Sequence, residues 1–405
     1  MKLKNECLSQ LMETYGDAFY LLDSAQFEKN YKELKDAFTT IYPNTNIAYS
    51  YKTNYIPKLC KIVNELGGFA EVVSEMEMEI ALRIGVNPNK IIWNGPVKNE
   101  KKMHELLLLG GVVNLDSVYE MSSILKLAQR YPSRTLNIGI RCNFDINDGV
   151  ISRFGFDVQS HEFREVLALV ERTQNIHLIG LQCHFATRCL DSWKPRVEGM
   201  LGLILEIGII PERIDLGGGL FGKMPDSLKK QFDTDIPTYE DYARIVAPLF
   251  AETFKECEVK PELLIEPGSA LVGDCMNFVS RVSTIKTVRG KSIASVLGSI
   301  YNINPTLNKK NPPLTIYHLG NEQKYYSDLD FGGFTCIESD YLYRNYQGHL
   351  GVGDVAVFGN VGSYSIVLKP PFILPNFPVI DISDGGEEVI KRAECFDDLF
   401  HTFQF

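Results

Sequence analysis

The sequence predicts a (β/α)8 barrel joined to a smaller β-rich domain. Eight short apolar runs alternate with amphipathic helical segments between residues 47 and 265, and open doubly wound sheets usually contain fewer strands. After Gly268 the pattern changes to short β-like runs separated by clusters of Gly, Pro and Asn. With 405 residues, 45% of them hydrophobic, the chain is long enough to bury the cores of both parts.

The expected elements follow one another in a regular order. A short helix precedes a strand at residues 19–22, before the barrel begins. The eight barrel strands are expected at residues 47–51, 70–73, 91–94, 112–115, 136–140, 178–183, 213–216 and 263–265. Helices with apolar residues at three- and four-residue spacing are expected between them, at 75–84, 100–109, 117–129, 161–172 and 239–257. Beyond the barrel, we expect strands at 276–288, 292–297, 355–358 and 365–368, and a surface loop at 304–313.

The composition excludes several classes of function. A formal net charge of -10 disfavours nucleic acid and anionic membranes as partners, because both are themselves acidic. The first residues lack the apolar core of a secretory signal, and no apolar run approaches the ~20 residues of a membrane helix. We therefore expect a cytoplasmic enzyme with a small-molecule substrate. The nine cysteines are odd in number and form no CxxC pair, which argues against disulfides and against a zinc site, so we expect no metal.

Polar residues stand at the ends of the expected barrel strands, where barrel enzymes place their reactive groups. These residues are Lys52, Asn94, Arg141, His184, the glycines 217–219, Glu266 and Gly268. By itself Lys52 is most simply a solvated cap, and the glycines are as readily a tight turn. Together they indicate pyridoxal 5'-phosphate, because three successive glycines expose backbone N–H groups to a phosphate while a lysine forms a Schiff base with an aldehyde.

Glu266 and His184 have defined tasks beside such a cofactor. A carboxylate that faces the pyridine nitrogen keeps it protonated, so that the ring absorbs the electron pair left by departing CO2. The alternative for Glu266 is an ion pair at a strand end. His184 either stacks on the cofactor ring or is a core histidine bonded to its neighbours, and its sequence context leaves both open.

In the order and spacing of its motifs, the chain resembles the fold-type III pyridoxal-phosphate enzymes. This family contains the ornithine and diaminopimelate decarboxylases and, more distantly, alanine racemase. Nearly the whole chain is covered by the resemblance. The matching elements are residues 48–54 (Ala-Tyr-Ser-Tyr-Lys-Thr-Asn), 71–74, 94–96, 152–155 (Ser-Arg-Phe-Gly), His184, 217–219, 266–268 (Glu-Pro-Gly), Cys336 with Asp340, and 362–364 (Gly-Ser-Tyr).

The resemblance implies an alanine racemase-like barrel over residues 25–268 and a β-rich domain formed by residues 1–24 and 269–405, in a homodimer with shared active sites. Cys336 and Asp340 are expected to come from the partner subunit, and Cys336 to act as the proton donor. An isolated cysteine would otherwise be a buried small hydrophobe. The expected cofactor contacts are Lys52, Arg141, His184, Gly217, Gly218, Gly219, Glu266, Gly268 and Tyr364.

Two features favour decarboxylation over racemisation. The racemases of this fold place an arginine at the pyridine nitrogen, whereas this chain has Glu266. Racemases also deliver a tyrosine base from the second domain, whereas decarboxylases use the Cys-x-x-x-Asp pattern found here at Cys336 and Asp340. An amino-acid racemase and a non-catalytic regulator resembling antizyme inhibitors are the alternatives.

The substrate is less closely defined. Ornithine and diaminopimelate decarboxylases typically have an arginine after Glu-Pro-Gly and an acidic residue after the catalytic cysteine, where this chain has Ser269 and Ile337. These departures disfavour diaminopimelate as the substrate. In these positions the chain resembles carboxynorspermidine decarboxylases and the decarboxylases of natural-product and siderophore pathways. Glu338 replaces the usual acidic residue only by a one-residue shift. The expected substrate contacts are Asn94, Arg188, Glu338 and Asp340.

Overall fold

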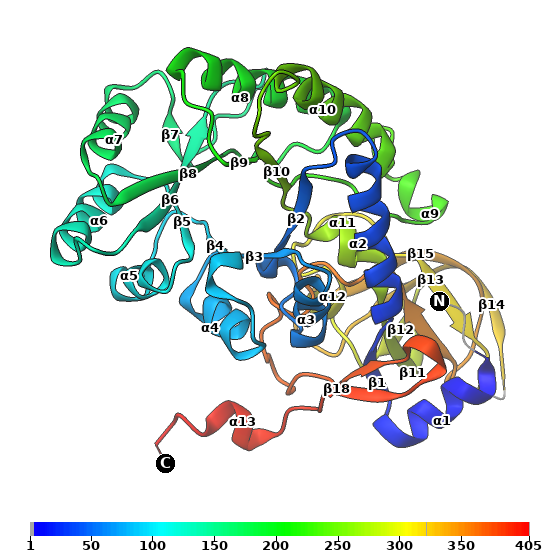
Figure 1. Ribbon diagram of the computed structural model, residues 1–405. Helices are drawn as coiled ribbons and strands as arrows, with labels where there is room; N and C mark the ends of the chain where they lie inside the picture. The colour runs from blue at the N-terminus through cyan, green and yellow to red at the C-terminus, as the bar shows by residue number, and fades with distance from the viewer. Residues whose placement is uncertain (1–3, 321, 405) are drawn as a thin grey trace. The chain divides into compact units, whose positions relative to one another are not determined.

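The chain divides into two compact units (Figure 1). The computed structural model describes residues 4–320 and 322–404. The barrel unit contains residues 28–222 and 234–270, and the β unit contains the described parts of 1–27, 223–233 and 271–405. The domain boundaries expected after residues 24 and 268 stay a prediction, and the compact units meet along the chain after residues 27 and 270. Residues 223–233 join the β unit, which the sequence did not indicate.

The barrel unit is built on eight parallel strands that close on themselves. Each strand pairs with the next along the chain, β10 pairs with β2, and the β5–β6 pairing completes the ring, so the predicted barrel is confirmed. A two-residue strand, β7 (Phe156–Asp157), extends the edge of β6. The barrel strands are β2 (Thr45–Ser50), β3 (Phe69–Val72), β4 (Ile91–Trp93), β5 (Val112–Leu115), β6 (Leu136–Asn143), β8 (Ile176–Gln182), β9 (Arg213–Asp215) and β10 (Glu262–Ile265).

Helices lie outside the ring of strands, as Figure 1 shows. Several begin at a side chain that accepts a backbone N–H of the first turn, among them Ser160 before α7 and Thr238 before α10. The helices of this part of the chain are α2 (Ser24–Thr39), α3 (Pro57–Glu65), α4 (Glu75–Arg83), α5 (Glu100–Leu108), α6 (Val118–Arg130), α7 (His161–Arg172), α8 (Trp193–Ile207) and α10 (Tyr239–Thr253). Among the described residues, none of the helices has the length and apolar character required to cross a membrane.

An apolar layer fills the barrel. It is formed by Ala48, Phe69, Ile92, Val112, Ile179 and Leu264, all of them buried. Parallel barrel strands are covered by helices on one face and by each other's side chains on the other, so they are apolar along most of their length. Polar side chains toward the carboxyl ends of the strands therefore stand out as exceptions that require partners.

The β unit is organised around the N-terminal strand. β1 (Ala18–Leu22) pairs antiparallel with β11 and parallel with β17, so the N-terminal segment completes this sheet as predicted. Its core joins α1 to the sheet through Leu8, Leu11, Phe19, Val279 and Val357. The remaining elements are α1 (Asn5–Tyr15), α9 (Asp226–Lys229), α11 (Ser269–Val272), α12 (Ile300–Ile303), α13 (Phe396–Phe400), β11 (Met276–Val288), β12 (Lys291–Val296), β13 (Leu314–Tyr317), β14 (Lys324–Gly332), β15 (Tyr341–Leu350), β16 (Val355–Phe358), β17 (Val379–Asp381) and β18 (Glu388–Lys391).

The strand predicted at residues 365–368 is wrong. These residues form a turn in which the N–H of Leu368 donates to the carbonyl of Tyr364 at 2.9 Å. Tyr364, a predicted phosphate ligand, has φ +64°, a left-handed conformation that reverses the chain and is uncommon for a bulky residue. Pro370 and Pro371 follow, and proline cannot donate to a β ladder.

Candidate active site

Lys52 projects from a turn at the carboxyl end of β2. The 3-10 turn Tyr51–Thr53 follows the last strand residue, Ser50, and leaves the lysine side chain 33% exposed. Its ammonium donates to the carboxylate of Glu71 on β3 and to the hydroxyl of Ser50 at 3.4 Å. The Glu71 side chain is fully buried, so it is a fixed acceptor for this one amine.

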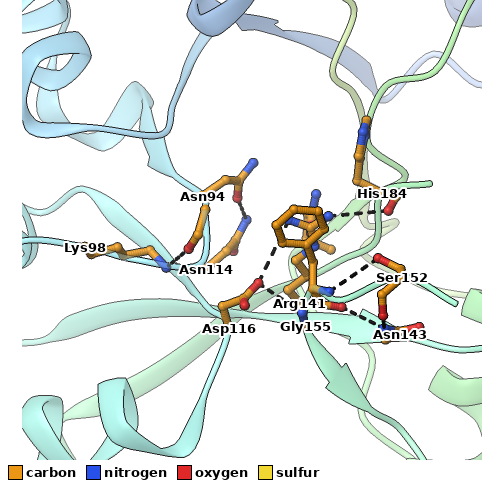
Figure 2. Close-up of polar contacts among 12 residues, drawn as sticks. Asn94, Lys98, Asn114, Asp116, Arg141, Asn143, Ser152, Gly155 and His184 are labelled. Carbon is orange, nitrogen blue, oxygen red and sulfur yellow. Dashed lines mark hydrogen bonds and ion pairs between the residues drawn. The ribbon is translucent and has the colours of Figure 1, made fainter. Parts of the chain in front are cut away.

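Asn94 is the centre of a buried polar network. Its amide nitrogen donates to Glu71 Oε1 at 3.1 Å and to Glu266 Oε1. Its oxygen accepts from Asn114 at 2.7 Å, as Figure 2 shows. Gln182 donates to the second oxygen of Glu266 at 3.3 Å. The network therefore joins side chains from the carboxyl ends of β3, β4, β5, β8 and β10 around the carboxylates of Glu71 and Glu266.

Asp215 and Glu266 form a buried acidic pair. Burial raises the pKa of Glu266 to about 7, and burial together with the charge of Glu266 raises the pKa of Asp215 well above its ordinary value. One oxygen of Asp215 accepts the N–H of Gly217 at 2.8 Å, whereas no described donor contacts the other. Both effects favour the neutral form of Asp215, and that form has a proton to donate toward Glu266.

His184 lies just beyond β8 with its ring held in one tautomer. Nδ1 accepts the backbone N–H of Gly218 at 2.9 Å, so this nitrogen carries no proton. Burial, followed by the positive charges of Lys52 and Arg141, lowers the pKa of the imidazole well below its ordinary value. The ring is neutral at physiological pH, with its proton on Nε2.

The three glycines differ in what their N–H groups do. Gly217 donates to Asp215 and Gly218 donates to His184. Of the three glycines, Gly219 is the one whose N–H has no acceptor among the described residues. The carboxyl and imidazole beside the loop therefore accept two of the three N–H groups, and phosphate binding at the three glycines stays a prediction.

Close backbone approach explains why glycine occupies these positions. A Cβ on Gly218 would clash with the carbonyl oxygen of Glu266, and a Cβ on Gly268 would clash with the hydroxyl of Thr53. Gly219 has φ +88°, in the region that favours glycine. The loop after β9 and the turn after β10 are thus pressed together at the carboxyl end of the barrel.

Arg141 joins three segments of the rim (Figure 2). Its guanidinium lies 3.9 Å from Asp116, donates to the carbonyl of His184 at 3.4 Å and lies over the ring of Phe154 at 4.7 Å. Asp116 in turn accepts the N–H of Gly155 at 3.0 Å. Arg141, on β6, is therefore fixed beside the histidine and against Phe154 of the Ser-Arg-Phe-Gly motif.

Arg188, a predicted substrate contact, stands in the loop after β8. Its guanidinium lies 5.7 Å from the centre of the Phe221 ring, and its backbone carbonyl accepts the hydroxyl of Tyr242 at 2.6 Å. The charge of Arg188 also contributes to lowering the pKa of His184. This arginine is half-buried on the histidine side of the rim.

The β unit carries the predicted proton donor. Cys336 and Glu338 are exposed on the loop between β14 and β15. Asp340 is buried, and its carboxylate accepts from the hydroxyls of Ser299 at 3.0 Å and Thr335 at 2.6 Å. In this unit Asp340 fixes the loop that presents Cys336.

Several residues of the network were not predicted. Gln182 and Asp215 are the last residues of their strands, and Glu71 and Asn114 are the next to last, so the rule that selected Lys52 and Glu266 also applies to them. Their role could not be predicted, because a single polar residue inside an apolar strand gives only a weak sequence signal.

The described residues fit a cofactor with an aldehyde, a basic ring nitrogen and a phosphate. A lysine amine, a carboxylate held by amide donors, a neutral imidazole and an unpaired N–H at a side-chain-free loop all lie at one rim of the barrel unit. Within the described residues, no cluster of three or more metal-binding side chains occurs.

Comparison with known proteins gives a consistent result. Residues 24–273 match the family described as pyridoxal-dependent decarboxylase, pyridoxal binding domain. Diaminopimelate decarboxylase from Methanothermobacter thermautotrophicus is 25% identical, with 96% of this chain and 92% of that protein covered, and the Aquifex aeolicus enzyme of the same name is 23% identical with the same coverage.

Solved structures share the fold along nearly the whole chain. Diaminopimelate decarboxylase from M. jannaschii superposes with a TM-score of 0.87 at 24% identity, over 98% of this chain and 94% of that one. The arginine decarboxylase of Paramecium bursaria Chlorella virus superposes with a TM-score of 0.74 at 21% identity, over 94% of this chain and 100% of that one.

Proposed function

This chain belongs to the pyridoxal-dependent decarboxylase family, so it is a carboxy-lyase that acts on an amino acid with pyridoxal 5'-phosphate, and we propose that its substrate is a carboxynorspermidine-like or natural-product amino acid rather than diaminopimelate. The observation that carries the catalytic part of the proposal is the network of Lys52, Glu71, Asn94 and Glu266 at one rim. It supports an amine and an acid acting on one bound ring.

Lys52 is the proposed anchor for the cofactor aldehyde. When bound, pyridoxal 5'-phosphate supplies an electron-poor ring that accepts the electron pair released with CO2. Glu71 keeps the lysine at the rim and is the nearest acceptor for the proton that its amine must lose before it reacts.

Glu266 is proposed to hold a proton at the ring nitrogen. For this role it must be ionised, and the hydrogen bonds from Asn94, Gln182 and protonated Asp215 favour the ionised form. His184 is proposed to stack on the ring. A neutral imidazole suits this position, because an imidazolium would repel a protonated pyridine.

Cys336 is the proposed proton donor to the carbon that loses CO2. Its exposure on a loop held by Asp340 supports a group that is presented to a site rather than packed in a core. A homodimer in which Cys336 and Asp340 complete the site of the other subunit remains part of the proposal.

The proposed substrate class rests on two replacements. Diaminopimelate has a second carboxylate and a second ammonium at its far end, which call for a cation and an anion in the site. Ser269 and Ile337 supply neither charge at the positions where the resembling enzymes have them. Arg188, on the histidine side of the rim, supports a substrate with an anionic group placed differently.

The substrate is tested by following CO2 release on a panel containing diaminopimelate, ornithine, lysine, carboxynorspermidine and amino-acyl conjugates. We expect a member of the last two classes to have the highest kcat/KM. In the double variant Ser269→Arg with Ile337→Glu, the ratio of kcat/KM for diaminopimelate to kcat/KM for the preferred substrate should rise by about tenfold or more. This factor corresponds to one charged hydrogen bond. Diaminopimelate as the best substrate of the unaltered enzyme would contradict the proposal.

The catalytic role of Lys52 is tested by Lys52→Ala, with Lys61→Ala on the exposed face of α3 as the matched control. We expect Lys52→Ala to lose both CO2 release and the visible absorbance of covalently bound cofactor, whereas the control keeps both. An undiminished absorbance band in Lys52→Ala would refute the assignment.

Racemisation and non-catalytic regulation are the weaker alternatives, since family membership favours loss of the carboxylate. Incubation of single enantiomers in deuterated water separates them. Inversion with the carboxylate retained would support a racemase, and cofactor binding without turnover across the panel would support a regulator.

A further inference from the structure

We infer that Arg196 is a positioning residue that holds the glycine loop in the form that binds the cofactor phosphate. The inference rests on the proposed function, in which residues 217–219 receive this phosphate. Arg196 lies in the first turn of α8, is completely buried, and belongs to no motif identified in the sequence.

The guanidinium of Arg196 is committed to backbone carbonyls. One terminal nitrogen donates to Gly218 at 2.6 Å and Leu216 at 3.3 Å, and the other donates to Phe185 at 3.0 Å and Thr187 at 3.2 Å. These carbonyls belong to the loops after β9 and β8, so one side chain ties the two loops together.

The cation is buried without an acidic counterion. Among the described residues, no ion pair to a carboxylate is formed by Arg196, although its side chain packs against the faces of Trp193 at 4.2 Å and Phe185 at 5.5 Å. Burying a charge without a charged partner is unfavourable. A phosphate dianion on the other side of the loop is a partner of matching charge.

The peptide between Gly218 and Gly219 transmits this charge. Its carbonyl points at Arg196, and because a trans peptide is planar, its N–H points the opposite way. That N–H, on Gly219, is the donor of the loop that has no acceptor among the described residues. The buried cation polarises the peptide and strengthens the N–H as a donor to an anion.

Close packing leaves no room for a side chain at Gly219. A Cβ on Gly219 would lie 2.7 Å from the carbonyl oxygen of Phe185 and 3.4 Å from the Arg196 guanidinium. The Arg196 cation therefore contacts the glycine loop on the side opposite to the phosphate. The position after Glu-Pro-Gly supplies no cation, because it is Ser269.

The test compares binding of pyridoxal 5'-phosphate with binding of pyridoxal, which lacks the phosphate, to the apo-protein of each variant. Arg196→Lys keeps the charge but cannot hold four carbonyls, and Arg196→Gln removes the charge. Arg213→Lys, at the amino end of β9 beside Glu262 and over Phe69, is the matched control. The phosphorus NMR shift of the bound cofactor gives a readout that does not depend on activity.

Arg196→Lys should weaken pyridoxal 5'-phosphate binding by about tenfold to a hundredfold, with the larger loss in Arg196→Gln, while pyridoxal affinity changes less than about twofold. The phosphorus shift should move toward that of free phosphate in both variants and stay unchanged in the control. Equal weakening for both ligands, or no change for either, would overturn the inference. Failure of the unaltered protein to bind the cofactor would instead overturn the proposed function.

Discussion

At the level of single residues, the protonation state of Asp215 is the most specific property of the site. Its second oxygen is buried without a described donor and its pKa is raised, and both observations favour a neutral acid beside Glu266. A neutral Asp215 acts as a hydrogen-bond donor to Glu266. A side chain of the same shape that also donates a hydrogen bond should therefore substitute for it.

We therefore predict that Asp215→Asn retains activity within about fivefold, whereas Asp215→Leu loses it, because only the amide still donates to Glu266. The same hydrogen bond lowers the pKa of Glu266, so its removal raises this pKa above about 7. The acid limb of kcat/KM should move to higher pH in Asp215→Leu and stay in place in Asp215→Asn. Inactive, well-folded Asp215→Asn would show that Asp215 is ionised.

Lys52 and Glu266 could be singled out from the sequence, whereas Glu71, Asp215 and Arg196 could not. Lys52 and Glu266 stand out because charged residues rarely end an apolar strand. Arg196 lies on a helix, where an arginine is ordinarily solvent-exposed, and its burial depends on two loops that come from other parts of the chain. Tertiary contacts of this kind leave no local pattern.

At the level of elements, the apolar barrel strands were predictable, whereas several strands of the β unit were not. All eight barrel strands lie where continuous apolar runs predict them. β14 and β15 were missed because exposed polar residues interrupt both, and their pairing shifts register three times. The false strand at 365–368 has strand-like residues, but Tyr364 and the two prolines override their preference.

Helix α10 provides a test at this level. Thr238 and Asp241 form a reciprocal cap, with the N–H of Asp241 donating to the Thr238 hydroxyl at 3.3 Å and the N–H of Thr238 donating to the carboxylate at 2.9 Å. Thr238→Ala should lower the free energy of unfolding by about 1 kcal/mol in urea titrations. Thr253→Ala, at the exposed end of the same helix, should change it by less than about 0.5 kcal/mol. Equal losses in both variants would exclude the cap as the cause.

For the whole molecule, burial of Glu77 and Glu266 in the barrel unit and of Lys369 in the β unit makes opposite contributions to the pH dependence of stability. In the barrel unit, burial raises the pKa of Glu77 and of Glu266 to about 7. The folded unit then binds more protons than the unfolded chain between the ordinary carboxyl pKa and about 7, so its stability falls as pH rises through this window. In the β unit, burial lowers the pKa of Lys369 to about 7, and its ammonium has no hydrogen-bond acceptor among the described residues.

The β unit should therefore behave in the reverse sense. Folded Lys369 binds fewer protons than the unfolded chain between about 7 and its ordinary pKa near 10.5, so stability rises with pH there and is lost as pH falls toward 7. Lys369→Met should raise the free energy of unfolding of this unit by about 2 kcal/mol at pH 7 and abolish the rise, whereas exposed Lys309→Met changes neither. Hydrogen exchange of β11 and β6 peptides at pH 6 and pH 8 measures each unit separately. Parallel pH responses in the two sets of peptides would show that these buried groups do not govern the stability of their units.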